Sequence, residues 1–345
     1  MPYGDIVPPY QLAAAPLPAP RGPFTDWLWH HLRQPPHDIG RPPPLADDPL
    51  YGDDSALGLY CLYELHYRGF PDVDDRWEWD PTLLAVRAHV EAAFDERVRQ
   101  EVGPLAPSAD VPAALHQLLN GPGGPSLSAY VAEIGTLQQL REYAVHRSAY
   151  QLKEADPHTW ALPRLTGGAK AAMVEIQADE YGQGFERDMH QTLYALTLTE
   201  LGLSPAYHAY LGLLPGSTLA TTNLVSYFGL HRRLRGALVG HLAVFEMTSV
   251  EPMGRYAAAL RRHGFGPAAR HFYEVHVVAD AHHQQVAGTA LAGGLAAQEP
   301  ALARDIVFGA HAVTAIEANF SRHLLTSWQA DATSLRIGRQ VAAAS

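Results

Sequence analysis

From about residue 54 to residue 328, most of the chain repeats apolar residues at positions i, i+3, i+4 and i+7, the spacing that covers one face of an α-helix. Short breaks containing proline or glycine separate these stretches. Strand-like alternation bounded by turn residues is nowhere convincing. Because short connections make long helices antiparallel neighbours, the pattern predicts an all-α fold built as a helical bundle. The predicted helices cover residues 54–67, 81–102, 110–120, 127–155, 168–201, 204–213, 217–227, 231–250, 252–263, 267–293 and 300–328.

The beginning of the chain has a different composition. Thirteen of the 27 prolines fall in residues 1–50. Proline lacks the N–H donor that helices and sheets need, so we expect a mostly irregular Pro-rich N-terminal arm over residues 1–50, with one short helix near 24–32 whose tryptophans pack on the body. The helical domain then spans residues 51–330, and residues 331–345 are expected to form a C-terminal tail.

Composition and charge limit the partners. The formal charge of 25 − 36 = −11 disfavours binding to phosphate backbones, so we expect no nucleic acid partner. No apolar run approaches the roughly 20 residues that span a bilayer, and the N-terminus lacks the basic and apolar segments of a secretory leader. We therefore expect a cytoplasmic protein without a membrane partner. The single cysteine, Cys61, excludes an intramolecular disulfide and thiolate metal sites.

The strongest chemical signal is the sequence VHVVADAHHQ at residues 275–284, inside the predicted 267–293 helix. At about 100° per residue, His276, Asp280 and His283 share one narrow stripe of that helix, with valine and alanine around them. If the stripe faces the bundle interior its polar groups need partners, and one metal ion satisfies all three. The alternative is an exposed polar stripe that shares a wet face with His282.

Two glutamates stand in unfavourable surroundings. Glu246 lies between Phe245 and Met247 in the predicted 231–250 helix, where a buried carboxylate costs several kcal/mol unless it is paired or bound to metal. The alternative is a helix-end glutamate that reaches solvent. Glu154 lies in the last turn of the predicted 127–155 helix, where the helix dipole opposes a negative charge.

The predicted 168–201 helix crowds acidic residues and a histidine into a stretch that otherwise reads as core: Glu175, Asp179, Glu180, Glu186 and His190. Glu186 and His190 form a natural i, i+4 pair. Glu186 nevertheless begins the charged run Glu186-Arg187-Asp188, so we expect it to be solvated. We predict that neither Glu186 nor Asp179 is a metal ligand.

The candidate residues form a donor set of four carboxylates and three imidazoles. Four carboxylates neutralise two divalent irons, 4 − 4 = 0, and carboxylate with imidazole but no thiolate is typical of non-haem iron or manganese rather than structural zinc. No Glu-x-x-His occurs, although ferritin-like di-iron bundles use that motif twice. No His-Glu-x-x-His, Gly-x-Ser-x-Gly or Gly-rich phosphate loop occurs either. The donors are Glu154, Glu180, Glu246 and Asp280 with His190, His276 and His283.

The run KEADPHTWALPRLTGGAKAAMVEIQADEYG, followed by His190, Glu246 and HVVADAHH, closely resembles the haem-oxygenase-like di-iron oxidases, often called iron-containing redox enzymes. The resemblance covers about 130 residues. It implies a haem-oxygenase-like bundle of about seven core helices plus short accessory helices, which binds two irons instead of haem and activates dioxygen. It also implies the metal ligands, with no catalytic residue beyond them: Glu154, Glu180, His190, Glu246, His276, Asp280 and His283.

One spacing in this ligand set conflicts with a regular helix. Glu180 and His190 are ten residues apart, or about 280° around a helix, so both reach one site only if the helix is distorted between them. We expect that distortion at Gly182 and Gly184.

Members of the family differ in what they do with activated oxygen. The long KEADPHTW segment resembles the biosynthetic N-oxygenases, and no unbroken apolar stretch indicates a tunnel for an acyl chain. We therefore favour N-oxygenation of an amine, an amino acid or amino-heterocycle, to a hydroxylamine or nitro product. The alternatives are an oxidase that cleaves C–C bonds in a fatty acid or amino acid, a non-catalytic metal- or haem-binding bundle, and a polar-cored structural protein.

The expected cofactors are two iron ions that alternate between Fe2+ and Fe3+, with dioxygen as co-substrate. An external reductant, and thus an electron donor as partner, must restore Fe2+. The other expected partner is a small-molecule amine substrate, and we allow for a homodimer. Candidate pocket residues, each of which also fits packing or surface roles, are Tyr150, His158, Trp160, Tyr227, His241, Glu317 and His323.

Overall fold

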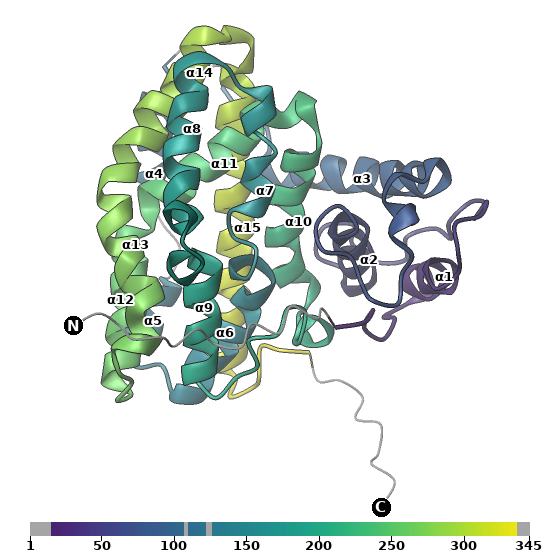
Figure 1. The fold of residues 1–345 in the computed structure, drawn as a ribbon, viewed down its shortest axis with the longest axis horizontal. Coiled ribbons are helices and arrows are strands. Elements are labelled where there is room, and N and C mark those ends of the chain that lie inside the picture. Colours follow the sequence, from purple (N-terminus) through teal and green to yellow (C-terminus); the bar gives the residue numbers. More distant parts are fainter. Residues whose placement is uncertain (1–14, 107–109, 122–125, 337–345) are drawn as a thin grey trace, which may run out of the picture.

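The computed structural model describes residues 15–106, 110–121 and 126–336, and it contains helices but no strand within those ranges. The longer helices pack into an elongated bundle, and α1, α2 and α3 lie at its side, next to α10 (Figure 1). The predicted all-α fold is therefore confirmed. The helices are α1 (Pro23–Leu32), α2 (Asp53–Glu64), α3 (Pro81–Val102), α4 (Val111–Leu119), α5 (Leu127–Glu133), α6 (Leu137–Gln151), α7 (Asp156–Thr159), α8 (Gly167–Glu180), α9 (His190–Glu200), α10 (Gly216–Leu230), α11 (Arg235–Thr248), α12 (Val250–Arg262), α13 (Pro267–Gln285), α14 (Gly294–Gln298) and α15 (Ala303–Gln329).

Several shorter elements connect these helices. A π-helix, Val286–Gly293, continues α13 directly into α14, so the predicted 267–293 helix is continuous but wider in its last part. The 3-10 turns are Asp75–Trp79, Leu162–Arg164, Gly182–Gly184, Glu186–Asp188, Leu211–Leu213, Arg232–Leu234 and Pro300–Leu302.

Two glycines allow α11 and α15 to touch through their backbones. A Cβ on Gly240 would lie 1.9 Å from the carbonyl oxygen of Ile306, and a Cβ on Gly309 would lie 2.0 Å from that of Ala237. Real Cβ atoms do not approach so closely, and only glycine leaves the space empty. This close contact fixes the position of α11, which carries Glu246.

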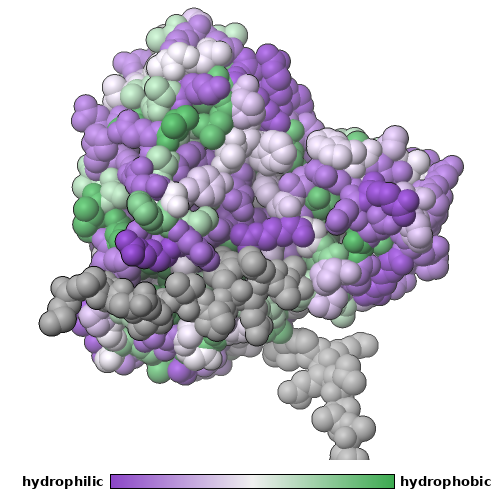
Figure 2. Space-filling model, viewed as in Figure 1, coloured by the Kyte–Doolittle hydropathy of each residue, from purple (hydrophilic) through white to green (hydrophobic). Residues whose placement is uncertain are grey.

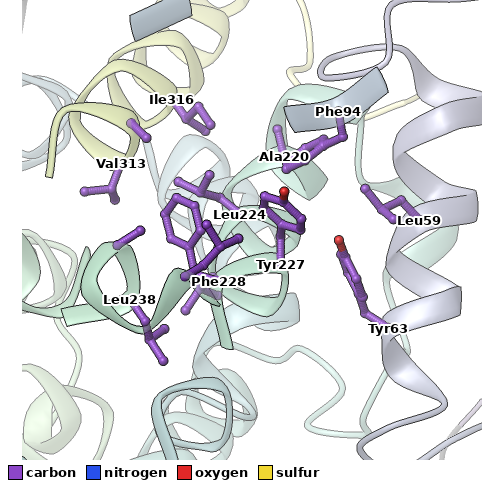
Figure 3. Close-up of a cluster of buried hydrophobic side chains, with 14 of the residues drawn as sticks. Leu59, Tyr63, Phe94, Ala220, Leu224, Tyr227, Phe228, Leu238, Val313 and Ile316 are labelled. Carbon is purple, nitrogen blue, oxygen red and sulfur yellow. The ribbon is translucent and has the colours of Figure 1, made fainter. Parts of the chain in front are cut away.

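The helices at the side share a hydrophobic core with the bundle. Figure 3 shows Tyr63 of α2 and Phe94 of α3 beside Leu224 and Tyr227 of α10, with Ile316 of α15 nearby. All five side chains are buried. The first helices are therefore packed as part of the domain rather than suspended from it.

The described part of the Pro-rich arm is attached at α1. Phe24 and Trp29 are almost completely buried, and the Asp54 carboxylate accepts hydrogen bonds from the N–H groups of Phe24 and Thr25, each at 2.9 Å. Asp54 thus satisfies free donors in the first turn of α1 from the neighbouring helix. The predicted helix near 24–32 is confirmed, and residues 1–14 lie outside the described residues.

The C-terminal segment is held on the body as far as Arg336. The N–H and Oγ of Ser334 donate to Glu142 Oε2 at 2.9 and 2.8 Å, and the N–H of Arg336 donates to the carbonyl of Leu213 at 2.8 Å. The first residues of the expected tail are therefore ordered by hydrogen bonds. The remainder of that tail, residues 337–345, lies outside the described residues.

Three predicted helices are wrong in part. The 127–155 stretch is two helices, because Gly135 ends one turn and Thr136 caps α6 through a reciprocal hydrogen-bonded pair with Gln139. Residues 204–213 form mostly turns, with His208 in a left-handed conformation at φ 64°. The 168–201 stretch is interrupted between α8 and α9.

The described helices were also compared with the requirements of a membrane span, and none of them is both long and apolar enough to cross a bilayer. On the face shown in Figure 2, hydrophobic residues form small patches among hydrophilic ones.

Candidate metal centre

The fold brings together all seven residues that the sequence predicts as ligands. They come from the four helices α8, α9, α11 and α13 and from the turn after α6, and they form two neighbouring groups. The first group is Glu154, Glu180, His190 and His276, and the second group is Glu246, Asp280 and His283.

In the first group, the imidazole of His190 is the centre of the contacts. Its Nδ1 lies 3.0 Å from Glu180 Oε2 and 4.0 Å from Glu154 Oε2, and Nε2 of His276 lies 3.6 Å from Glu154 Oε1. One nitrogen or oxygen atom from each of the four residues lies within 4.8 Å of all the others. The four side chains therefore point at one small volume.

In the second group, Nδ1 of His283 lies 3.2 Å from Glu246 Oε2 and 3.5 Å from Asp280 Oδ1. His276, Asp280 and His283 come from the same face of α13, as the helical stripe predicts, and all three are buried. Because His276 belongs to the first group, α13 joins the two groups. The stripe faces the interior, and the exposed alternative is wrong for these three residues.

Hydrogen bonds outside the two groups fix which ring nitrogen faces inward. Nδ1 of His276 donates to the carbonyl of Phe272 at 2.7 Å, which leaves Nε2 free toward Glu154. Nε2 of His283 donates to Asp179 Oδ2 at 2.8 Å, which leaves Nδ1 free toward Glu246. Such outer hydrogen bonds orient imidazoles that bind metal.

Several buried polar atoms of the two groups have no hydrogen-bond partner. Such atoms are costly, because a buried donor or acceptor that loses water needs a replacement. They all point into the groups, and a cation bound there would satisfy the oxygens and the lone pairs of the nitrogens together. The donor chemistry therefore fits a metal. The atoms are Glu180 Oε2, His190 Nδ1, Glu246 Oε2, His276 Nε2 and His283 Nδ1.

Burial has opposite effects on the acids and on one of the bases. It raises the pKa of Glu180 to about 7 and that of Glu246 to about 8, and it lowers the pKa of His190 to about 3. Without a cation, these carboxylates retain protons near neutral pH while His190 stays neutral. Metal binding releases such protons, because ligands bind in their deprotonated form.

The expected distortion between Glu180 and His190 is present. Glu180 is the last residue of α8 and His190 the first of α9, and Gly182, Gln183 and Gly184 all have positive φ angles, of 59°, 53° and 82°. This left-handed turn brings the two side chains to the same group. A side chain at Gly182 would collide with the backbone at Asp188 and Met189, so the glycine is required.

The two acidic residues that we excluded as ligands lie outside both groups. Glu186 is exposed in the 3-10 turn Glu186–Asp188. Asp179 contacts only the outward nitrogen of His283 within the set. A second outer contact comes from Ser249, whose Oγ donates to Asp280 Oδ2.

The turn that carries Glu154 is held on both sides. Glu154 follows the end of α6 instead of lying in its last turn, as we had expected. Its neighbour Lys153 is fully buried and lies 2.7 Å from Glu64 Oε2, and Gln177 of α8 donates to the carbonyl of Ala155 at 3.1 Å. These contacts position Glu154 without using its carboxylate.

A cavity of about 380 Å³ reaches the two groups. The metal-facing part of its wall contains Glu154, Glu180, Glu246, His276 and Asp280. Of the candidate pocket residues, Tyr150, His158 and Glu317 line it, whereas Trp160, Tyr227, His241 and His323 are not part of its wall.

The sequence reasoning missed Arg147, whose guanidinium lines the same cavity. A signal for it was present. Tyr143, Arg147, Tyr150 and Glu154 are spaced by four, three and four residues, which places them on one side of α6. Asp179 and Lys153 gave no such signal, because their partners come from other elements.

With the geometry described, comparison with known proteins identifies the family. Residues 141–318, more than half of the chain, match the profile described as "Iron-containing redox enzyme". The chain belongs to this family of iron-containing redox enzymes. The predicted family is thus confirmed, and the protein is an oxidoreductase whose family uses iron.

A solved structure supports the fold. The crystal structure of a CADD-like protein of unknown function from Nostoc punctiforme superimposes with a TM-score of 0.50 and 15% sequence identity. The match covers 62% of this chain and 94% of that chain. At this identity the likeness concerns the fold, and it agrees with the predicted haem-oxygenase-like bundle.

A characterised relative is the nitrosourea synthase of Streptomyces achromogenes subsp. streptozoticus. It is 31% identical over 137 residues, which cover 39% of this chain. The match spans only 29% of the relative's length. The similarity therefore concerns one part of a longer protein.

Proposed function

We propose that the chain is a non-haem di-iron oxygenase that adds oxygen to the nitrogen of a small-molecule amine. The observation that carries the proposal is the convergence of unpartnered buried nitrogen and oxygen atoms in two adjacent groups that line one cavity. Two adjacent ligand groups suit two metal ions better than one. The resident groups would be two irons, one held by each set of residues.

The charges of the ligand set suit this pair of irons. Glu154, Glu180, Glu246 and Asp280 supply four negative charges, which balance two divalent ions in a buried site. Three imidazoles complete a donor set of oxygen and nitrogen without thiolate, which suits non-haem iron. A single haem needs only one proximal histidine, so it leaves most of these buried donors unexplained.

Two reduced irons bound there would supply dioxygen with electrons and with Lewis acidity. The protein's residues prepare the other reactant. The cavity places an amine beside Glu154, Glu246 and Asp280, where burial disfavours its protonated form and exposes the nitrogen lone pair. Aromatic side chains, Tyr150 and Phe245, stack with ring centroids 5.5 Å apart on the same wall and exclude water from it.

The relative supports the choice of nitrogen as the atom that receives oxygen. Its printed name refers to a nitrosourea, and a nitroso group holds oxygen on nitrogen. The matched part is a fraction of that protein, so its substrate is not carried over. The reductant that restores Fe2+ and the final oxidation level of the nitrogen are further parts of this proposal.

The test is incubation of the iron-loaded protein with isotope-labelled dioxygen, a reductant and a panel of amines and fatty acids. The expected result is an amine product that gains labelled oxygen on nitrogen, detected by mass. The Glu246→Ala variant serves as a control and should form no product. Fragments from C–C cleavage, with no oxygenated amine, would replace the proposed reaction with the alternative one.

A further inference from the structure

One charged pair lies in the wall of the cavity away from the metal ligands. Arg147 of α6 places Nη1 at 2.9 Å from Glu317 Oε1 and Nη2 at 2.6 Å from Glu317 Oε2, a two-pronged contact with α15. The side chains are only 12% and 21% exposed. Buried ion pairs are not in themselves an economical source of stability, because apolar residues often serve equally well. A pair retained in a cavity wall therefore suggests recognition of a ligand.

The charges of the cavity wall are not balanced once the metal ligands are set aside. Two irons would neutralise the four carboxylates of the centre. The other charged lining residues are Arg147, Arg322 and Glu317, which leave one net positive charge. Arg322 is exposed, whereas Arg147 is largely buried. A ligand with one negative charge complements this wall.

Arg147 can bind such a ligand without releasing Glu317. A guanidinium has five N–H donors and Glu317 engages two of them, so three remain. Phe320 lies against the guanidinium, with its ring centroid 4.4 Å from Cζ, and this contact helps to hold the plane in place. Planar guanidinium groups are well suited to carboxylates.

We propose that the substrate is an amine that also carries a carboxylate, and that Arg147 binds the carboxylate while the amine nitrogen faces the metal centre. This inference rests on the proposed N-oxygenation for the place of the amine. A neutral amine with one carboxylate has the single negative charge that the wall requires. A cavity of about 380 Å³ accommodates an amino acid, and Tyr143, Tyr150 and Phe245 offer an apolar wall between the two ends.

The test compares amino acids with their own primary amides, which have nearly the same shape but no negative charge. Binding of the proteinogenic amino acids, of aminophenylacetic acid and of all the corresponding amides is measured calorimetrically on the iron-loaded protein without oxygen, so that no turnover occurs. Charge-assisted hydrogen bonds predict that the acids that bind do so at least about tenfold more tightly than their amides.

Two variants separate recognition from a merely structural ion pair. Glu317→Gln frees Arg147 from its competitor, so the preference for acid over amide should persist or increase. Arg147→Met combined with Glu317→Gln removes both charges without leaving one unpaired, and the preference should fall to about onefold. A merely structural pair would make the two variants behave alike. Arg147→Lys keeps the charge and should keep most of the preference, even if the double variant folds poorly.

A matched control lies outside the cavity. Arg99 and Asp95 of α3 form a pair at 2.8 Å, and Arg99→Met with Asp95→Asn should leave the preference unchanged. Equal binding of acids and amides to the wild type, or no binding of any acid in the panel, would overturn the inference. The proposed reaction is tested separately: selective binding of acids without oxygen on nitrogen refutes only N-oxygenation, and equally efficient oxygenation of amines that lack a carboxylate refutes only the role of Arg147.

Discussion

His283 donates a hydrogen bond from Nε2 to Asp179 Oδ2 at 2.8 Å, and this contact turns Nδ1 toward Glu246 and Asp280. Asp179 itself is held by Gln183, which donates to its other carboxylate oxygen from the left-handed turn between α8 and α9. The turn that brings Glu180 and His190 together therefore also orients His283. One local break in a helix serves both groups of ligands.

Removal of this outer carboxylate should weaken one of the two metal positions. Asp179→Ala leaves the imidazole of His283 without its orienting acceptor, and loss of such a partner typically weakens metal binding by about 10- to 100-fold. Asp179→Asn, which still accepts a hydrogen bond, should have a smaller effect. The measurement is equilibrium competition for Fe2+ against a chelator.

The matched control for Asp179 lies on the same two helices. Glu175 Oε1 lies 2.8 Å from Nε2 of His282, but both side chains are more than half exposed and neither belongs to the ligand groups. Glu175→Ala should leave iron affinity unchanged. An equal loss of affinity in the Glu175 and Asp179 variants would contradict the positioning role of Asp179.

The close contact of α11 with α15 should make Gly240 intolerant of a side chain. Gly240→Ala places a methyl group against the backbone of Ile306, and such overpacking should destabilise the fold by about 2 kcal/mol or more. Gly294→Ala is the comparison, because this helical glycine has nothing within 4 Å of an added Cβ. Denaturant midpoints should fall for the first variant and stay level or rise slightly for the second.

The ion pair behind Glu154 should make stability depend on pH in the acid range. Burial alone would raise the pKa of Glu64, but the charges of Lys153 and His208 outweigh that effect and hold the pKa at about 2, against an ordinary value of 4.5. The unfolded chain therefore binds the proton more readily, so this stabilisation is present above pH 4.5 and is lost as the pH falls toward 2.

The Glu64→Gln variant isolates this contribution. It leaves Lys153 buried without its anionic partner, which should cost about 3–5 kcal/mol at neutral pH. The difference in unfolding free energy between wild type and variant should shrink as the pH is lowered from 5.5 toward 3.5. A difference that stays constant over that range would show that Glu64 titrates normally in the folded protein.

The fold was most predictable where local chemistry marked both ends of an element. The predicted 81–102 helix agrees with α3, since Asp80 caps the first turn, Pro81 begins it and Gly103 ends it at φ 71°. The 204–213 segment misled the periodicity, because Tyr207 and Leu211 are buried at helical spacing although the backbone forms turns. Burial produces such a pattern without a helix.

The candidate site was predictable to a different extent. His276, Asp280 and His283 lie on one helix, so the sequence alone placed them together. The other four positions followed from the family resemblance, and the glycines between Glu180 and His190 indicated how those two could meet. Arg147 pairs with Glu317 across 170 residues of sequence, and only the packed bundle brings such residues into contact.

The central claim is that two irons occupy two groups of ligands, and anaerobic titration of the metal-free protein with Fe2+ tests it most directly. The wild type should bind two irons per chain. His190→Ala should weaken the position formed with Glu154, Glu180 and His276, and Glu246→Ala the position formed with Asp280 and His283. Each variant should then retain about one tightly bound iron, since each group keeps its own remaining donors. Glu186→Ala should bind two. Saturation of the wild type at one iron, or two tightly bound irons in both ligand variants, would contradict the account.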